Sequence, residues 1–234
     1  MSVFSWILAF IVWASPPGHK IPYPEGQETV EEAMERYNSI VNDIIAVVYN
    51  PDTKPLFRGP DGRARTVAVI LSVMSHESGF MKHVDYNLGK YGRGDSGRSW
   101  CMMQIKVGKG RTMPWNIVHN RPPKWNDPAE EVFKWYTGEE LIQDRKLCIS
   151  EGLKILRLSF GQCSKLPLED RLRSYASGNC DDGAAASHNR MNTAMNWFNK
   201  SYSKELSDEK VMASLPPILP SETPISQDPS VAGL

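Results

Sequence analysis

The sequence lacks several features that would assign it to a common class of protein. Its 27 Lys and Arg residues equal its 27 Asp and Glu residues, so it has no excess of positive charge to bind nucleic-acid phosphates. It contains no Cys-x-x-Cys pair, so nothing supports a zinc knuckle or a thioredoxin-like redox site. No apolar run reaches the length of about 20 residues that a membrane-spanning helix needs. We therefore expect no nucleic-acid partner, no metal and no cofactor.

The composition suits one well-packed domain. Of the 234 residues, 41% are hydrophobic and 23% are charged, which provides enough apolar surface for a single core. From Ala213 onwards, prolines alternate with Ser, Thr, Glu and Asp, and such a segment lacks the apolar surface that would offset its ordering entropy. We therefore expect a monomeric domain over residues 20–212 and a disordered tail over residues 213–234.

Residues 3–14 form an uncharged apolar segment that ends at Ser15-Pro16. Its length falls within the range of about 7–15 residues that is typical of the apolar region of a secretory signal, although no Lys or Arg precedes it. We expect residues 1–19 to be a signal peptide and the protein to be exported to the periplasm or cell envelope. The alternatives are an anchor to a membrane or to an envelope or virion complex, and a helix that packs on the domain.

The spacing of apolar residues predicts a mostly helical domain. Thr29 with Glu32, and Thr137 with Glu140, form capping boxes, each of which precedes apolar residues at helical spacing. The expected helices start after Thr29, cover residues 65–78 and 138–160, pass through residues 168–176, and start again at Ser187.

A glycine-rich segment interrupts this pattern over residues 82–98. Its glycines alternate with polar and charged residues, which predicts a hairpin or a long loop. We therefore expect an α+β fold that is mostly helical and has a small hairpin or loop excursion. This combination resembles a lysozyme-like domain, in which a cleft lies between the helical body and the hairpin.

The four cysteines allow two disulfides in an exported protein. If residues 138–160 form one helix, Cys148 and Cys163 lie about 22 Å apart, which is beyond the reach of a disulfide. We favour Cys101 with Cys148 and Cys163 with Cys180. Four buried free thiols in a cytosolic or virion-internal protein are the alternative.

Glu77 is the candidate catalytic residue. We expect it at the C-terminal end of an apolar helix, where the helix dipole and burial beside Met74 and Phe80 would both raise the pKa of its carboxyl group. A carboxylic acid that keeps its proton can protonate the leaving oxygen of a glycosidic bond. Taken alone, a Glu at this position is also compatible with a solvated helix end.

Three segments follow the order and approximate spacing of the Glu-Ser, Gly-Leu-Met-Gln and Ala-Tyr-Asn signatures of the soluble lytic transglycosylase family. They are Glu77-Ser78-Gly79-Phe80, Cys101-Met102-Met103-Gln104-Ile105 and Ser174-Tyr175-Ala176-Ser177-Gly178. The segment 148–156 is also similar to the central helix of that family. The resemblance covers about residues 65–180, which is half of the chain. Cys101, Met102 and Ala176 stand where the family has Gly, Leu and Asn.

The resemblance implies cleavage of the β-1,4 bond between N-acetylmuramic acid and N-acetylglucosamine in the glycan strands of peptidoglycan. Glu77 would be the single acid/base, and Ser78 would orient the substrate or Glu77. Met103 and Gln104 would contact the muramoyl sugar from the cleft wall, and Tyr175 would place its hydroxyl group near Glu77. The C6 hydroxyl group of the sugar would replace water, so that the product carries a 1,6-anhydro end.

A second carboxylate would imply a different outcome on the same substrate. If it lay about 6.5–9.5 Å from the acid, it could activate water and give a muramidase similar to goose-type lysozyme. Asp85 and Asp95 are the candidates for this general base. Asp95 lies within Arg-Gly-Asp-Ser-Gly and is also typical of a turn residue.

Two other enzyme classes have less support. A cysteine peptidase could use Cys101 with His119 or His188, but four cysteines that can pair leave no thiolate nucleophile. A metal hydrolase could use His76 and His83, but a zincin helix needs His at positions i and i+4, and Phe follows His76 at that spacing.

A non-enzymatic module that binds the cell wall is the alternative from another class. Its binding would depend on aromatic side chains rather than on Glu77. The candidate aromatic residues are Trp100, Trp115, Trp125, Trp135 and Tyr136. A phage-encoded protein of the virion or of lysis is the alternative to a bacterial envelope protein, because both would need the same chemistry.

Overall fold

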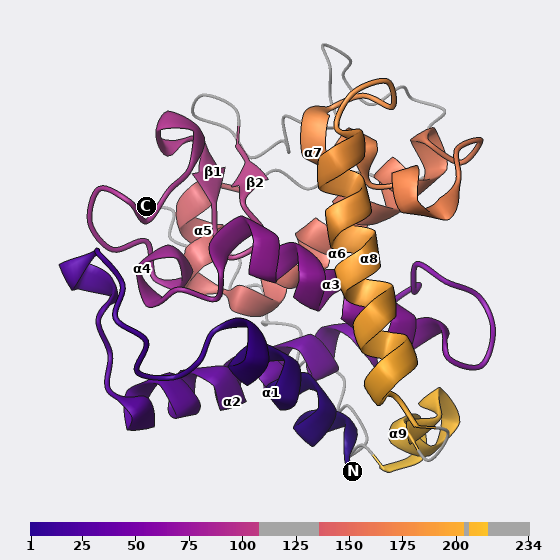
Figure 1. The fold of residues 1–234 in the computed structure, drawn as a ribbon, viewed down its shortest axis with the longest axis horizontal. Coiled ribbons are helices and arrows are strands. Elements are labelled where there is room, and N and C mark those ends of the chain that lie inside the picture. The colour runs from indigo at the N-terminus through magenta and orange to yellow at the C-terminus, as the bar shows by residue number, and fades with distance from the viewer. Residues whose placement is uncertain (108–135, 204–205, 215–234) are drawn as a thin grey trace, which may run out of the picture.

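The computed structural model describes residues 1–107, 136–203 and 206–214, and these residues are mostly helical (Figure 1). The α-helices are α1 (Val3–Ala14), α2 (Val30–Val48), α3 (Gly62–Ser78), α4 (Lys82–Asp85), α5 (Gly138–Gln143), α6 (Arg145–Gln162), α7 (Arg173–Ser177), α8 (Ala184–Ser201) and α9 (Asp208–Ser214). Short 3-10 turns are η1 (Pro24–Gly26), η2 (Asp95–Gly97) and η4 (Leu168–Asp170). Strands β1 (Ser99–Trp100) and β2 (Ile105–Lys106) form an antiparallel hairpin. The expected mostly helical α+β class is therefore confirmed.

Local sequence signals explain where several helices begin and end. Thr29 accepts a hydrogen bond from the backbone N–H of Glu32, whose carboxylate accepts one from the backbone N–H of Thr29, and this box starts α2. Thr137 and Glu140 start α5 in the same way. Helix α3 ends at Gly79, which has a φ of 57° that favours glycine.

The expectation of one helix over residues 138–160 is wrong. The backbone at Asp144 is extended, with φ −124° and ψ 99°, and it divides α5 from α6. The Asp144 side chain accepts the backbone N–H of Leu147, so the break is stabilised as an N-cap. Both Cys148 and the C-cap Cys163 still belong to α6, so the argument against their pairing is unchanged.

Two further helix expectations need correction. Residues 168–176 form the turn η4 followed by the short helix α7, rather than one helix. Ser187 does not cap α8, because that helix begins after Gly183. The Ser187 hydroxyl group is buried and instead donates to the carbonyl oxygen of Glu169 at 2.6 Å and accepts the N–H of Leu172 at 3.0 Å. It therefore connects α8 to the segment before α7.

Helix α3 lies at the centre of the described residues. Its residues from Thr66 to Met74 are all buried, so it needs apolar neighbours on every side. Helices α1, α2, α8 and α9 all contact it. In Figure 1, α8 runs beside α3 on one side of the molecule and α1 lies on another.

Helix α1 contributes to the same core. Trp6 and Phe10 are completely buried, and the Trp6 Nε1–H donates to Ser201 Oγ of α8 at 2.8 Å. The Phe10 ring makes edge contacts with Phe80 and Trp197. Residues 3–14 therefore pack on the other helices of the described chain. In the described parts of the chain, no helix is long and apolar enough to cross a bilayer.

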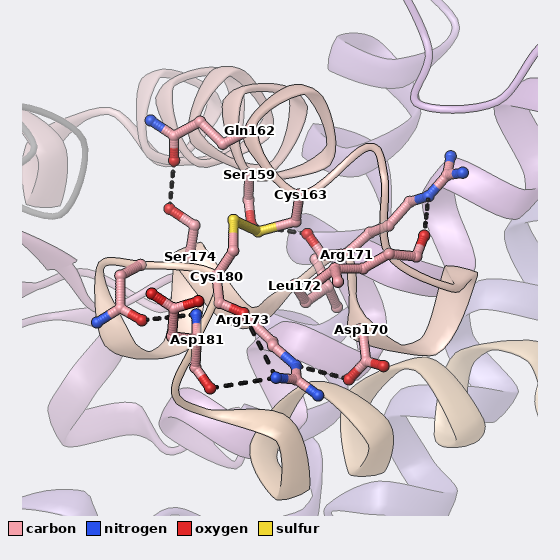
Figure 2. The surroundings of a disulfide bond; sticks show 12 residues. Ser159, Gln162, Cys163, Asp170, Arg171, Leu172, Arg173, Ser174, Cys180 and Asp181 are labelled. Atoms are coloured by element: carbon pink, nitrogen blue, oxygen red, sulfur yellow. Dashed lines mark hydrogen bonds and ion pairs between the residues drawn. A yellow bond between two sulfur atoms is a disulfide. The ribbon is translucent and has the colours of Figure 1, made fainter.

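The cysteines form two disulfides, and their pairing is the one that the sequence favours: Cys101 with Cys148, and Cys163 with Cys180. The first disulfide fastens the β1–β2 hairpin to α6. The second closes the segment that carries α7 (Figure 2). Beside it, the Ser159 hydroxyl group donates to the Arg171 carbonyl at 2.7 Å and accepts the N–H of Tyr175 at 3.0 Å. Helix α7 is thus held against α6 covalently and by hydrogen bonds.

The tail expected over residues 213–234 begins inside helix α9, which includes Ala213 and Ser214. The rest of that segment, residues 215–234, lies outside the described residues.

The packing of α1 leads to a first prediction. We expect Phe10→Ala to lower the free energy of unfolding by about 3–5 kcal/mol, because it leaves a cavity in a closed core. Trp13→Ala is the matched control: Trp13 lies on the same helix but is 62% exposed, so we expect a loss below about 1.5 kcal/mol. Urea unfolding of the three proteins measures both values. Equal, small losses would contradict the packing of α1 into the core.

Candidate functional site

Glu77 lies in the last turn of α3, and its side chain is 19% exposed. Its Oε1 accepts two hydrogen bonds from the Arg190 guanidinium group, one from Nε at 3.1 Å and one from Nη2 at 2.6 Å. Arg190 lies on α8 and is 113 residues from Glu77 in the sequence. The packing of α8 against α3 therefore brings the two side chains together.

Arg190 is fixed at both ends. Its Nη1 donates to the carbonyl oxygen of Ala186 at 3.0 Å, one turn earlier on α8. Its own carbonyl oxygen accepts a hydrogen bond from the hydroxyl group of Ser72, a buried residue of α3, at 2.7 Å. The guanidinium group is thus held in place before any ligand arrives.

Arg190 is not among the residues that the sequence motifs indicate, although the sequence contains one signal for it. The buried residues Ser187, Met191 and Ala194 define the inner face of α8, and Arg190 lies three residues after the first and four before the last. A cation on the buried face of a helix needs a carboxylate partner, because an unpaired buried charge is costly. This pattern indicates an ion pair but does not identify which acid forms it.

Burial raises the pKa of Glu77 above its ordinary value of 4.5. The charge and hydrogen bonds of Arg190 lower this pKa, but by less than burial raises it, and the negative charge of Asp95 raises it further. The direction agrees with the expectation, and the main cause is desolvation. Glu77 therefore holds its proton to a higher pH than an exposed Glu.

Tyr175 lies within electrostatic reach of Glu77. Its hydroxyl group is buried and donates to the carbonyl oxygen of Met103. Burial, followed by the charge of Glu77, raises the pKa of Tyr175 well above its ordinary value of 10.0. Its phenol group therefore stays protonated at neutral pH, and its proton is engaged by the Met103 carbonyl.

Ser78 has a different role from the one that the resemblance implies. Its side chain is buried, and Oγ donates to the carbonyl oxygen of Met74 at 2.8 Å and accepts the N–H of Phe80 at 3.3 Å. The hydroxyl group is engaged with the backbone where α3 ends. Ser78 thus shapes the turn that follows Glu77.

Met103 and Gln104 also differ from expectation. Met103 is completely buried and packs on Gly152 of α6, where a Cβ would lie 2.7 Å from its Cε, so its side chain lines no surface. Gln104 is partly exposed, and its Nε2 donates to the carbonyl oxygen of Cys101 at 3.0 Å. Its Oε1 lies against Gly94, where a Cβ would approach to 2.3 Å. Gln104 thus joins the hairpin to the loop that carries Asp95.

Asp85 cannot serve as a general base in this arrangement. It is buried on α4, and Arg145 donates to both of its oxygens, from Nε at 3.0 Å and from Nη2 at 2.9 Å. Arg36 approaches it at 3.7 Å, and Arg145 also pairs with Asp43 at 2.7 Å. Asp85 therefore belongs to an ion-pair network that joins α2, α4 and α6.

Asp95 is the better placed of the two candidate acids. Its side chain is 54% exposed, and Oδ2 contacts Lys106 Nζ at 3.3 Å and accepts from Ser99 Oγ at 3.2 Å. Its negative charge contributes, after burial, to the raised pKa of Glu77. The contacts of Asp95 within the hairpin also agree with its interpretation as a turn residue.

Backbone strain is concentrated directly after Glu77. In the described part of the chain, every non-glycine residue with a positive φ lies between residues 80 and 104: Phe80, Asn87, Asp95, Ser96, Cys101 and Gln104. Such conformations cost free energy and persist at functional sites, where the surrounding structure imposes them. Here, the Cys101 disulfide and the side chain of Gln104 supply part of that constraint.

The remaining predicted residues have less support. Cys101 is in a disulfide, so it offers no thiol for a peptidase. Trp100 is buried, with Arg93 4.6 Å above its ring, and cannot be an open platform for a sugar. Among the described residues, no group of three or more His, Cys, Asp or Glu is arranged to hold a metal. The predictions for Trp115, His119, Trp125 and Trp135 lie outside the described residues.

Comparison with known proteins gives no match: no family model, no curated protein and no solved structure is significantly similar to the chain.

The contrast between the two acids gives a second prediction. We expect Asp85→Asn to lower the free energy of unfolding by about 1.5–3 kcal/mol, because Arg145 would lose one of its two carboxylate partners and keep only Asp43. Asp95→Asn should change it by no more than about 0.5 kcal/mol, because Asp95 is largely exposed. Thermal and urea unfolding distinguish the two. A stable Asp85→Asn protein would reopen Asp85 as a functional residue.

The raised pKa of Glu77 gives a third prediction. Since the folded state binds this proton more tightly than the unfolded chain, the free energy of unfolding should decrease as the pH rises from 4.5 through the folded pKa. Glu77→Gln should remove this part of the pH dependence. Urea unfolding of both proteins at several pH values above 4.5 measures it. An unchanged pH dependence in the variant would contradict the raised pKa.

Proposed function

We propose that the chain is a peptidoglycan lytic transglycosylase with a lysozyme-like fold, in which Glu77 is the single acid/base. The observation that carries the proposal is a half-buried carboxyl group at the end of the central helix, with a raised pKa and with a buried phenol group in electrostatic reach. A group that must first give and then take back one proton needs such a pKa.

The chemistry needs no water. Glu77 would donate its proton to the glycosidic oxygen as the bond from that oxygen to C1 of the muramoyl sugar breaks. The C6 hydroxyl oxygen of the same sugar would then bond to C1, and its proton would pass to the Glu77 carboxylate. The products are a free 4-hydroxyl end and a 1,6-anhydro end, and Glu77 regains the proton that it donated.

Two features of the chain support this proposal. The β1–β2 hairpin that follows Glu77 is fastened to α6 by the Cys101–Cys148 disulfide, which suits a rigid wall for a glycan strand. Disulfides persist in oxidising compartments, which agrees with an exported protein that meets peptidoglycan in the periplasm or cell envelope.

A muramidase is the second candidate, because the charge of Asp95 acts on Glu77. In that reaction, Asp95 would activate a water molecule for attack on C1, and the product would have a reducing end. The partners of Asp95, Lys106 and Ser99, hold its carboxylate in a fixed orientation, as a general base requires.

The fourth prediction tests the reaction. We expect the full chain to release muropeptides from purified peptidoglycan that are one water lighter than hydrolysis products, and Glu77→Gln to reduce the release by at least about 1,000-fold because no other acid replaces it. Mass spectrometry of the soluble products measures both. Asp95→Asn is the matched control, and we expect its products and rate to be close to those of the wild type.

Other outcomes of this experiment are equally informative. Reducing-end products that disappear in Asp95→Asn would establish the muramidase. Full activity of Glu77→Gln would remove Glu77 from the mechanism. No release by the wild type would contradict both enzymes and leave the wall-binding module, which a pull-down with insoluble peptidoglycan detects.

A further inference from the structure

We infer that Arg190 is a positioning residue that decides which oxygen of Glu77 exchanges the proton. The inference rests on the proposed function and goes beyond it, because the resemblance assigns no role to any residue of α8. It is carried by the distances between two side chains that the fold brings together.

Both hydrogen bonds from Arg190 go to the same oxygen of Glu77. Nε and Nη2 donate to Oε1, whereas a fork-to-fork pair would place one donor on each oxygen. Oε2 has no hydrogen bond to any of the residues that the structure describes. A carboxylate oxygen has about two lone-pair directions, so Oε1 is fully engaged by the guanidinium group. The proton of the acid form therefore resides on Oε2, and Oε2 is the atom that meets the glycosidic oxygen.

Further hydrogen bonds of Arg190 keep its guanidinium group on Oε1 of Glu77. Nη1 is held by the Ala186 carbonyl, and the backbone of Arg190 is held by Ser72 of α3. Ser72 lies on the same helix as Glu77, so this hydrogen bond holds the α8 backbone at Arg190 against the helix that carries the acid. A fixed side chain keeps the reacting oxygen in place before the substrate binds, and a misplacement of about 1 Å can cost about 100-fold in rate.

Arg190 also balances the burial of Glu77. Desolvation favours the neutral acid, and the guanidinium group favours the carboxylate that must form after the first proton transfer. Other charged and titratable groups face the same region. Asp95 lies on the hairpin side and His76 is the neighbour of Glu77 on α3, where its Nε2 contacts Thr193 of α8 at 3.3 Å.

The test compares kinetic constants and pH profiles of the full chain. We expect Arg190→Met to lower kcat for muropeptide release by about 10–100-fold and to leave KM within about threefold, because the substrate loses no direct contact. The alkaline limb of the kcat profile should move up by about one pH unit or more, because the cation that favoured the carboxylate is gone. Arg190→Lys keeps the positive charge but not the planar guanidinium group. We therefore expect its alkaline limb to stay at the wild-type pH and its kcat to lie between those of Arg190→Met and the wild type.

Arg65→Met is the matched control. Arg65 also connects α3 to α8, through its guanidinium group 5.5 Å from the Phe198 ring, and it makes no contact with Glu77. We expect wild-type kcat, KM and pH profile in this variant. A loss of kcat equal to that of Arg190→Met would show that the general packing of α3 and α8, rather than the Arg190 contact, is responsible.

A direct titration separates this inference from the proposed function. In protein labelled with ¹³C at the Glu carboxyl groups, the NMR pKa of Glu77 should be higher in Arg190→Met than in the wild type, whether or not the protein cleaves glycans. An unchanged Glu77 pKa, or an active Arg190→Met protein with wild-type kcat and pH profile, would overturn the role of Arg190 alone. If the Glu77 pKa is higher in Arg190→Met than in the wild type but the wild type has no muralytic activity, the proposed function is rejected, and with it the catalytic role of the pair.

Discussion

The arrangement of the described helices follows from the need to cover α3 on every side. This helix is buried from Thr66 to Met74, and α1, α2, α8 and α9 supply its neighbours. Because it is covered all round, α3 has little freedom to shift or rotate, and polar groups on it must find partners within the protein. Its two end turns are partly exposed, and Glu77 lies in the last one. The candidate acid therefore lies at the end of a helix that is buried along most of its length.

The properties of Glu77 arise from two opposing effects. Desolvation favours the neutral acid, and Arg190 favours the carboxylate, with burial the stronger of the two. An acid/base that works in both directions needs such a compromise, since a pKa far from the working pH disables one of the two steps. The packing that buries α3 against α8 produces both effects at once, because it removes water from Glu77 and brings Arg190 to it.

The short motifs around Glu77 act mainly through the backbone. Ser78 is engaged with the end of α3, and the Met103 side chain packs on Gly152 while its carbonyl accepts the Tyr175 hydroxyl. The hairpin, α6 and α7 are in turn joined by two disulfides and by Ser159 (Figure 2). These residues hold the hairpin, α6 and α7 together and shape the end of α3.

The mostly helical class, the capping boxes at Thr29 and Thr137 and the end of α3 at Gly79 can be predicted from the sequence, because they depend on local backbone chemistry. Helix length excludes a disulfide between Cys148 and Cys163, but it leaves two pairings, of which the structure has the favoured one. The roles of the charged side chains, in contrast, depend on contacts between segments that are far apart in the sequence. Asp85 and Asp95 look alike in the sequence, yet Arg145 occupies the first and the second stays exposed near Glu77. The pairing of Arg190 with Glu77 spans 113 residues, and the burial of residues 3–14 depends on helices that come later in the chain. The partners of a charged side chain come from distant segments of the chain, so a local sequence pattern does not predict whether the charge is paired or exposed.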